Sequence, residues 1–422
     1  MKFISTRGNS PEVSASVAIR TGLAPDGGLY VPKTFPEVEI PKSIPPYANF
    51  ASRVIQPFFE GDPLSNDIPE ICREAFSFDV PLHWLTEKQA VLELFHGPTA
   101  AFKDFGARFL AAVMEKLQKG KDRDLTILVA TSGDTGSAVA SAFYKKKGIK
   151  VKVLYPEGRV SKRQEKQLTC WDGNISSYCV TGNFDDCQKM VKTAFTDKSL
   201  TVDWDLSSAN SINLGRLLPQ IVYFYYSSVL FFNKTGRKPV IIIPSGNVGN
   251  SVGAYWAVEL GAPVEKIILA VNANTTIPEF IKSGKYSPRP SVATIANAMD
   301  VGDPSNMERL RYLFSDRDQI LKNMKAVSVT DNRIKKTIRN TYKKYGYVMC
   351  PHTAAGEWVR QSNSADRPSI VVSTAHPAKF ETVVEPEIGR VVSIPESLKG
   401  MLETKANFFK IEPDINKLFQ DI

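Results

Sequence analysis

Residues 94–105, Leu94-Phe95-His96-Gly97-Pro98-Thr99-Ala100-Ala101-Phe102-Lys103-Asp104-Phe105, organise this chain. Lys103 lies between two phenylalanines, just ahead of apolar residues at helical spacing from Phe109 to Leu117. Apolar surroundings disfavour the charged form of an amine, and a neutral lysine is what a carbonyl cofactor needs to form a Schiff base. The alternative is a surface lysine whose aliphatic stem crosses two core phenylalanines.

A second stretch has the pattern of an anion-binding loop. The apolar run from Pro239 to Pro244 is of strand type and leads, through Ser245-Gly246-Asn247-Val248-Gly249-Asn250, into a segment that can continue as a helix. A strand, such a loop and a helix start present backbone N–H groups to an anion, and the helix dipole adds to the attraction. Neither the dinucleotide fingerprint nor the P-loop pattern is present. A plain strand-to-helix turn is the alternative.

The composition is that of an ordinary folded protein, with 43% hydrophobic and 23% charged residues. At 422 residues the chain is long enough for two or three domains. The net charge of +9 is dispersed along the sequence. We therefore expect it to favour small anionic substrates, and we expect no nucleic-acid partner.

Cysteine usage and hydropathy favour a cytoplasmic protein. The five cysteines are odd in number and lack C-x-x-C spacing, which is typical of reduced thiols rather than of disulfides or a zinc site. The first residues contain no apolar signal core. The most apolar run, residues 217–232, is interrupted by Pro219, Gln220, Ser227 and Ser228. It predicts a buried helix and no membrane span.

The order of apolar and amphipathic segments predicts an α/β fold with parallel-rich sheets. Strands are expected over residues 125–130, 151–155, 239–244, 266–271 and 369–373, with helices over 137–147, 184–195 and 212–232. We expect an N-terminal accessory domain at residues 1–90. A middle α/β domain at 91–235 and a second α/β domain at 236–390 follow, and a surface segment at 391–422 ends the chain.

Two further loops could bind substrate. The strand at 125–130 is followed by Thr131-Ser132-Gly133-Asp134-Thr135-Gly136, whose hydroxyls and free N–H groups suit a carboxylate. In the alternative, Asp134 or Thr135 merely caps a helix. The segment from Asn210 and Ser211 to Arg216 also has two interpretations. Asn210 or Ser211 could simply cap the long helix, or Arg216 could bind a phosphate beside that cap.

A last polar group follows the strand at 369–373. Thr374 and His376 lie where that strand ends, before Pro377, and ligands collect at the carboxyl edge of open α/β sheets. A structural histidine is the alternative for His376. No two of the four histidines have metal-ligand spacing, so no metal site is expected.

These motifs and their order resemble those of the threonine synthases, in particular the long bacterial and fungal form. These are pyridoxal-phosphate enzymes of the tryptophan synthase β-like fold (fold type II). The likeness covers most of the chain and is most specific in the strings His96-Gly-Pro-Thr-Ala-Ala-Phe-Lys-Asp104 and Thr374-Ala-His-Pro-Ala-Lys-Phe380. It also includes residues 21–29 and the string Asn297-Ala-Met-Asp300.

The resemblance implies a role for each motif. Lys103 would hold pyridoxal 5'-phosphate as a Schiff base, and Thr374 would hydrogen-bond the pyridine nitrogen. The cofactor phosphate would be held by backbone groups of Gly246, Asn247, Val248, Gly249 and Asn250. The substrate carboxylate would be received by Thr131, Ser132, Gly133, Asp134 and Thr135, and the substrate phosphate by Asn210, Ser211 and Arg216.

Two positions depart from the pattern of these relatives. Where long-form relatives more often have phenylalanine and aspartate in the phosphate loop, this chain has Val248 and Asn250. We expect phosphate binding to persist, because its contacts are largely with the backbone. Asp134 stands where the wider fold usually has asparagine, which leaves open the partner of the cofactor's phenolic oxygen.

The implied activity is conversion of O-phospho-L-homoserine and water to L-threonine and phosphate, the last step of threonine biosynthesis. The freed Lys103 amine would remove the α-proton, and Lys103 or the leaving phosphate would move a β-proton. Long-form relatives suggest a monomer. The alternatives are another fold type II lyase, such as a threonine dehydratase, and a noncatalytic metabolite-binding relative.

Overall fold

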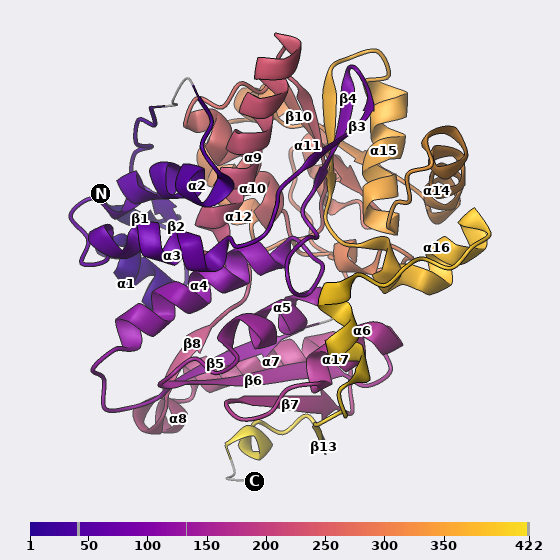
Figure 1. Cartoon of the computed structure of the whole chain (residues 1–422). Helices are drawn as coiled ribbons and strands as arrows, with labels where there is room; N and C mark the ends of the chain where they lie inside the picture. Colours follow the sequence, from indigo (N-terminus) through magenta and orange to yellow (C-terminus); the bar gives the residue numbers. More distant parts are fainter. Residues whose placement is uncertain (40–42, 132, 420–422) are drawn as a thin grey trace.

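The computed structural model describes residues 1–39, 43–131 and 133–419. Two large sheets dominate this part of the chain, one above the other in Figure 1, and a small antiparallel pair lies near the N-terminus. The small pair consists of β1 (Phe3–Ser5) and β2 (Tyr30–Pro32). The two large sheets carry parallel strands with helices on both faces, as expected for an α/β fold.

The first large sheet has six strands within the described ranges, and all neighbours are parallel except the antiparallel pair β3 and β4. In spatial order its strands are β11 (Ala326–Ser328), β10 (Lys266–Val271), β9 (Val240–Pro244), β12 (Ser369–Ser373), β4 (Gln89–Glu93) and β3 (Leu82–Thr86). Successive residues of β9 face opposite layers of core, with Ile241 and Ile243 on one side and Val240 and Ile242 on the other.

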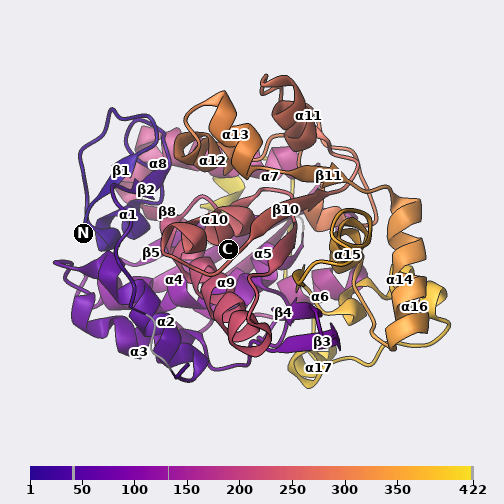
Figure 2. The same ribbon diagram turned by 90° about the horizontal axis from the view of Figure 1, so that it is seen from above.

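Helices cover both faces of this sheet. On one face lie α14 (Asp331–Tyr345) and α15 (Pro351–Asn363), with α14 outermost in Figure 2. On the other lie α9 (Leu214–Thr235) and α10 (Gly249–Glu259), which pack on each other. Because β9 and β12 are covered on both sides, they read as continuous apolar runs.

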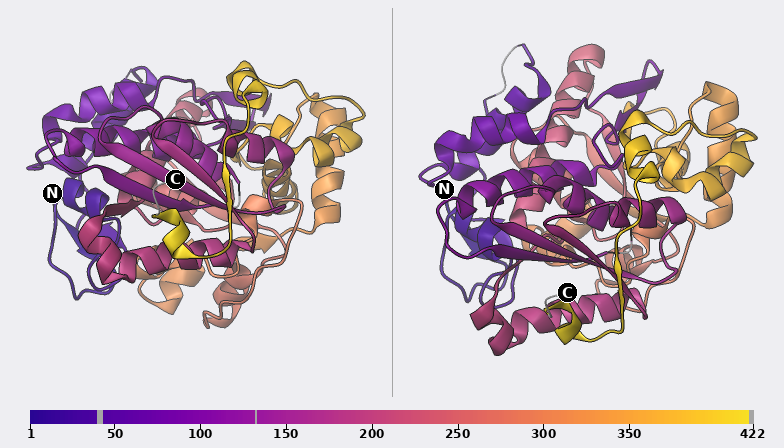
Figure 3. Two further views of the ribbon diagram at one scale, coloured as in Figure 1. Left: turned by 90° about the horizontal axis from the view of Figure 1, so that it is seen from below. Right: turned by 60° about the horizontal axis from the view of Figure 1, so that its bottom comes forward.

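The second large sheet has five strands in the described chain, all parallel to their neighbours. In spatial order they are β13 (Phe409–Ile411), β7 (Ile175–Val180), β6 (Ile149–Pro156), β5 (Leu125–Ala130) and β8 (Asp205–Ser208). One face packs towards α4 (Lys103–Gln118) and α5 (Asp134–Phe143). The other is partly covered by α7 (Phe184–Thr196) and the C-terminal segment, which crosses to this sheet in Figure 3.

The N-terminal helices pack against α4 and α9, so the first part of the chain shares the main core. They are α1 (Ala15–Thr21), α2 (Tyr47–Ile55) and α3 (Ile68–Ala75). The remaining α-helices are α6 (Lys162–Thr169), α8 (Lys198–Asp203), α11 (Thr276–Ser283), α12 (Met307–Leu313), α13 (Arg317–Asn323), α16 (Glu381–Ile388) and α17 (Glu396–Glu403). Short 3-10 helices are η1 (Gln56–Phe59), η2 (Ser65–Asp67), η3 (Asn297–Met299), η4 (Pro377–Phe380) and η5 (Ile415–Leu418).

The strands expected over residues 125–130, 266–271 and 369–373 have the predicted bounds. The expected segment boundaries do not coincide with the sheets in two places. Strand β4 pairs with β12 in the six-stranded sheet, and β13, within the tail expected to lie on the surface, extends the five-stranded sheet beside β7. Both pairings join segments far apart in sequence, so local pattern does not reveal them. The division into domains at 90, 235 and 390 stays a prediction.

Candidate active site

The Lys103 segment is aligned along the end of β12. Leu94 N donates to Ser373 O at 3.0 Å, Phe102 N donates to Thr374 O at 2.8 Å, and His376 N donates to Ala100 O at 3.0 Å. Lys103 is the first residue of α4. These bonds bring Lys103 and Thr374 together at the carboxyl edge of the six-stranded sheet, which is where the sequence placed a ligand site.

The turn before α4 is held by a buried carboxylate. Asp104 accepts hydrogen bonds from Thr99 N at 2.9 Å and from Thr99 Oγ1 at 2.6 Å. Between these residues Ala100 adopts a left-handed conformation with φ of 52°. Because this conformation is unfavourable for alanine, the surrounding hydrogen bonds must hold it, and they fix the direction in which α4 starts.

Lys103 has the electrostatic character that the sequence predicted. The residue is half-buried, and burial lowers the pKa of its amine to about 8. The charges of Arg216 and Lys379 lower this pKa further, and Asp134 opposes them. About a tenth of the Lys103 amine is therefore neutral at pH 7, far more than for an ordinary lysine, and the neutral form is the nucleophile.

The loop between β9 and α10 is built as an anion cradle. Within the described chain, the six backbone N–H groups from Gly246 to Ser251 donate to no protein acceptor. Val248, the N-cap of α10, has φ of 51°, a left-handed conformation of the kind found where successive N–H groups form an anion-binding concavity. Gly246 is required by packing, since a Cβ there would lie 2.8 Å from Met299 Cα. The arrangement fits a phosphate group at a helix N-terminus.

Side chains of the cradle reach the second expected anion site. Asn247 Nδ2 donates to Ser211 Oγ at 2.5 Å, and Asn247 Oδ1 accepts from Ser305 N at 2.6 Å. Asn250 Oδ1 accepts from Tyr223 OH at 2.5 Å, while its buried Nδ2 has no partner among the described residues. The loops around 211 and 247 are thus direct neighbours.

The long helix α9 is capped by neither residue that the sequence suggested. Its cap is Asn213, whose side chain accepts from Gly215 N, and Asn210 and Ser211 lie before it. Arg216 lies two residues after the first residue of the helix, and burial lowers its pKa to about 10. Arg216 Nη1 donates to Ala209 O at 2.6 Å, and its Nε is buried without a partner in the described chain. This guanidinium has donor capacity left for an anion.

The loop after β5 differs from its predicted arrangement. Ser132 lies outside the described residues. The Thr131 hydroxyl accepts from Gly133 N and Gly136 N, both at 3.0 Å, so it holds the turn. Gly133, with φ of 153°, is the N-cap of α5, which makes the side-chain cap suggested for Asp134 or Thr135 wrong. The N–H groups of Asp134 and Thr135 donate to no described acceptor.

The carboxylate of Asp134 is not available to bind a substrate carboxylate. It lies 2.8 Å from Lys379 Nζ and accepts from Gln164 Nε2 at 3.1 Å. Burial acts to raise the pKa of Asp134, but Lys379 and Lys103 outweigh it and hold that pKa well below its usual range. An ionised, buried carboxylate would repel a second one, so the Asp134 side chain is unsuited to binding a carboxylate.

Thr374 and the two nearby histidines have different environments. The buried Thr374 has no hydrogen-bond partner for its hydroxyl among the residues described. His376 Nδ1 accepts from Ala378 N at 3.2 Å and caps η4, so its structural reading is the better one. His352 Nε2 accepts from Ala298 N at 3.1 Å, and burial lowers the pKa of His352 to about 4.

Sequence reasoning assigned no role to several groups that build this site. Lys379 belongs to the string 374–380, but nothing in that string indicates that Lys379 pairs with Asp134. Tyr223, Gln164 and His352 lie on three different helices. No local spacing marks such residues, because each meets the site only through tertiary packing.

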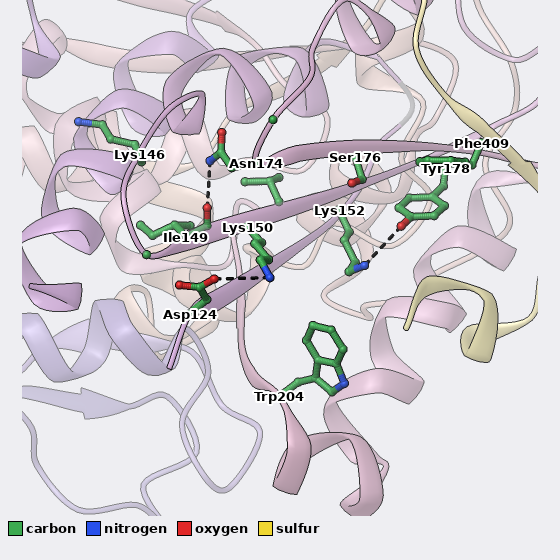
Figure 4. Close-up of a pocket in the computed structure, with 13 residues that line it drawn as sticks. Asp124, Lys146, Ile149, Lys150, Lys152, Asn174, Ser176, Tyr178, Trp204 and Phe409 are labelled. Carbon is green, nitrogen blue, oxygen red and sulfur yellow. Dashed lines mark hydrogen bonds and ion pairs between the residues drawn. The ribbon is translucent and has the colours of Figure 1, made fainter. Parts of the chain in front are cut away.

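A separate cavity of about 470 Å³ lies on the outer face of the five-stranded sheet (Figure 4). Its lining is basic and aromatic, with Lys152 Nζ 3.3 Å from Tyr178 OH, and Trp204 on the other side. None of the predicted site residues lines it. Within the described ranges, no cluster of three or more His, Cys, Asp or Glu side chains could hold a metal ion.

Comparison with known proteins identifies the family. Three family models match the chain: "Pyridoxal-phosphate dependent enzyme" over residues 87–359, "Threonine synthase N terminus" over 2–76 and "Threonine synthase, C-terminal" over 351–422. Threonine synthase of Buchnera aphidicola (subsp. Schizaphis graminum) is 39% identical over 425 residues, covering 99% of this chain and 98% of that protein. The chain belongs to the threonine synthase family.

Solved threonine synthase structures agree with this assignment. The Escherichia coli enzyme superposes with a TM-score of 0.90 at 37% identity, covering 99% of this chain and 98% of that one. The pyridoxal-phosphate-bound threonine synthase from Brucella melitensis gives 0.91 at 33% identity, with the same coverage of both chains. Membership confirms the predicted fold class, enzyme class and cofactor, pyridoxal 5'-phosphate.

Proposed function

We propose that this protein converts O-phospho-L-homoserine and water to L-threonine and phosphate. The observation that carries the proposal is the run of six unbonded N–H groups in residues 246–251, which follows β9. At the end of the neighbouring strand, β12, Phe102 N donates to Thr374 O, so the backbone of Thr374 lies next to the residue before Lys103. A phosphorylated aldehyde that bridges the cradle and the amine fits this pair of neighbouring strand ends.

The residues present fit the cofactor. Its phosphate would be held by backbone groups of Gly246, Asn247, Val248, Gly249 and Asn250, with the unpaired Asn250 Nδ2 as a further donor. Thr374 would donate or accept a hydrogen bond at the ring nitrogen. When bound, pyridoxal phosphate stores the electron pair that an α-proton leaves behind, which no side chain can do.

Lys103 would act as both attachment point and base. Its pKa of about 8 lies near neutral pH, where a base can take up a proton and also return it. We propose that Lys103 removes the α-proton of the substrate and that Lys103 or the leaving phosphate moves the β-proton.

Two neighbouring groups of residues would bind the substrate. We propose that Asn210, Ser211 and Arg216 hold its phosphate, which the free donor capacity of Arg216 supports. Its carboxylate would meet the N–H groups of Asp134 and Thr135 at the start of α5, in the loop that also contains Thr131, Ser132 and Gly133.

A direct assay tests the function. The purified protein should release inorganic phosphate from O-phospho-L-homoserine and form L-threonine in equal amount. Formation of 2-oxobutyrate from L-threonine, without phosphate release, would instead identify a dehydratase of the same fold. Absence of both products from a protein that binds the cofactor would identify a noncatalytic relative.

We further propose a cytoplasmic monomer without nucleic-acid or membrane partners. The dispersed charge, the unpaired cysteines and the resemblance to the long-form enzymes support this. No helix in the described ranges is long and apolar enough to cross a bilayer. Light scattering after gel filtration tests the oligomeric state, and a dimer mass would contradict it.

A further inference from the structure

Lys379 is an ammonium group enclosed completely by protein. Its side chain is 0% exposed, and its Nζ lies 2.8 Å from Asp134 Oδ1 and 2.8 Å from the Thr99 carbonyl oxygen. A buried cation is stabilised only by such close and well-aligned partners. Lys379 is therefore held at one position, between two loops of the candidate site.

The three partners come from different parts of the molecule. Asp134 starts α5 after the five-stranded sheet, whereas Lys379 lies in η4 after β12 of the six-stranded sheet. Thr99 belongs to the Lys103 segment and is tied to Asp104 through its N–H and hydroxyl groups. On the α5 side, Gln164 donates to Asp134 from α6.

We propose that Lys379 is a positioning residue of the site, which ties Asp134 and the substrate loop at the start of α5 to the Thr99 carbonyl of the Lys103 segment. The inference rests on the proposed function, since it concerns how the same site is assembled and charged. It also gives a role to Asp134, which stands where the wider fold usually has asparagine, because here the aspartate forms half of a neutral buried pair.

The Lys379–Asp134 pair also contributes to the electrostatic environment of the Lys103 amine. Lys379 lowers the pKa of Lys103 and Asp134 raises it, so the two contributions oppose each other as long as the pair is intact. Removal of either partner leaves the charge of the other without compensation, and that charge then shifts the pKa of Lys103. The nitrogen of Lys103 should then respond in opposite directions to the two substitutions, which a purely structural role does not require.

The other titratable and charged groups around Lys103 are known. Arg216 of α9 adds positive charge, and Asp104 of α4 is buried, with a pKa raised by that burial. His352 of α15 is neutral near pH 7, because burial lowers its pKa to about 4. None of these groups contacts Lys379 by hydrogen bond or ion pair in the described structure, so they remain in place in the variants.

The test compares Lys379→Met, Asp134→Asn and the double variant, each loaded with pyridoxal phosphate. The measured quantities are the pH midpoint of the visible absorption of the bound cofactor and the pH midpoint of kcat/KM. Lys379→Met should raise both midpoints by about one pH unit or more, and Asp134→Asn should lower them by a similar amount. The double variant should return close to the wild-type values.

Lys410→Met is the matched control, because Lys410 forms an exposed pair with Glu157 at 2.6 Å and should leave both midpoints unchanged. Midpoints that move in the same direction in both single variants, or in neither, overturn the inference even while phosphate release continues. If Lys379→Met does not fold, the other two variants provide the test. Both pH midpoints should fall in Asp134→Asn and return close to the wild-type values in the double variant. A wild-type protein without a visible cofactor band would instead refute the proposed function itself.

Discussion

Lys103 has a pKa lowered to about 8 by burial, with Arg216 and Lys379 adding to that effect. Lys103→Ala should therefore abolish the visible cofactor band together with turnover, which should fall at least about 10³-fold, since the attachment point and the base are lost together. Absorption spectra and phosphate release measure the two losses. Lys119→Ala, at an exposed lysine directly after α4, is the control. A yellow and active Lys103→Ala protein would contradict the assignment.

Arg216 tests the separation of the two anion sites at the same scale. Arg216→Ala should raise the KM for O-phospho-L-homoserine roughly 10- to 100-fold, because a charge-assisted hydrogen bond contributes about 1.5–3 kcal/mol. The cofactor should stay bound. Since Arg216 also braces the Ala209 carbonyl, Arg216→Lys is the companion variant that keeps the charge. Loss of the cofactor band in Arg216→Ala would show that this residue serves the cofactor phosphate instead.

At the scale of elements, the site depends on close approach between the β9–α10 loop and η3. A Cβ at residue 246 would lie 2.8 Å from Met299 Cα and 3.0 Å from Ala298 O, and neither backbone atom can turn aside. The loop therefore has to be glycine at this position, and the cradle keeps its shape because η3 is packed against it. The same loop reaches the segment before α9 through Asn247 and Ser211.

Gly246→Ala should push these elements apart. We expect a loss of about 1–3 kcal/mol in the free energy of unfolding, as for other overpacked sites, and weaker cofactor binding. Chemical denaturation and cofactor titration measure the two effects. Gly400→Ala is the control, because nothing lies within 4 Å of the added methyl group and the residue is inside α17, so that variant should be neutral or slightly more stable. Equal behaviour of both variants would contradict the packing argument.

At the scale of the whole molecule, the N-terminal helices, both sheets and α9 share one continuous core. All five cysteines fall within the described ranges and carry free thiols, of which only Cys170 is not fully buried. Burial raises the pKa of Cys170 to about 11 and that of Cys187 to about 12. Both burial and the scarcity of thiolate make these groups slow nucleophiles.

The folded protein should therefore react only slowly with a disulfide reagent at pH 8, with Cys170 first. Five thiols should react rapidly after unfolding in denaturant, because burial and the raised pKa values disappear together. Absorbance of the released thiolate counts the groups, and Cys170→Ser should remove the first phase. Fewer than five reactive thiols in the unfolded, unreduced protein would reveal a disulfide.

Local patterns in the sequence specify the individual strands, loops and motifs of this protein. Continuous apolar runs predicted β5, β10 and β12 to the residue, since strands covered on both faces contain few polar positions. The sequence also revealed the Lys103 string and the glycine-asparagine loop, because each of them is a contiguous pattern. Such strings were enough to indicate the family.

Which of these strands, loops and motifs contact one another depends on the tertiary fold. The pairing of β4 with β12, the addition of β13 to β7, the contact of Asn247 with Ser211 and the burial of Asp134 against Lys379 all join residues distant in sequence. Such contacts depend on strand order and helix packing, which no local spacing records. For the same reason no local pattern predicted that the side chain of Asp134, in the loop after β5, pairs with Lys379, which follows a strand of the other sheet.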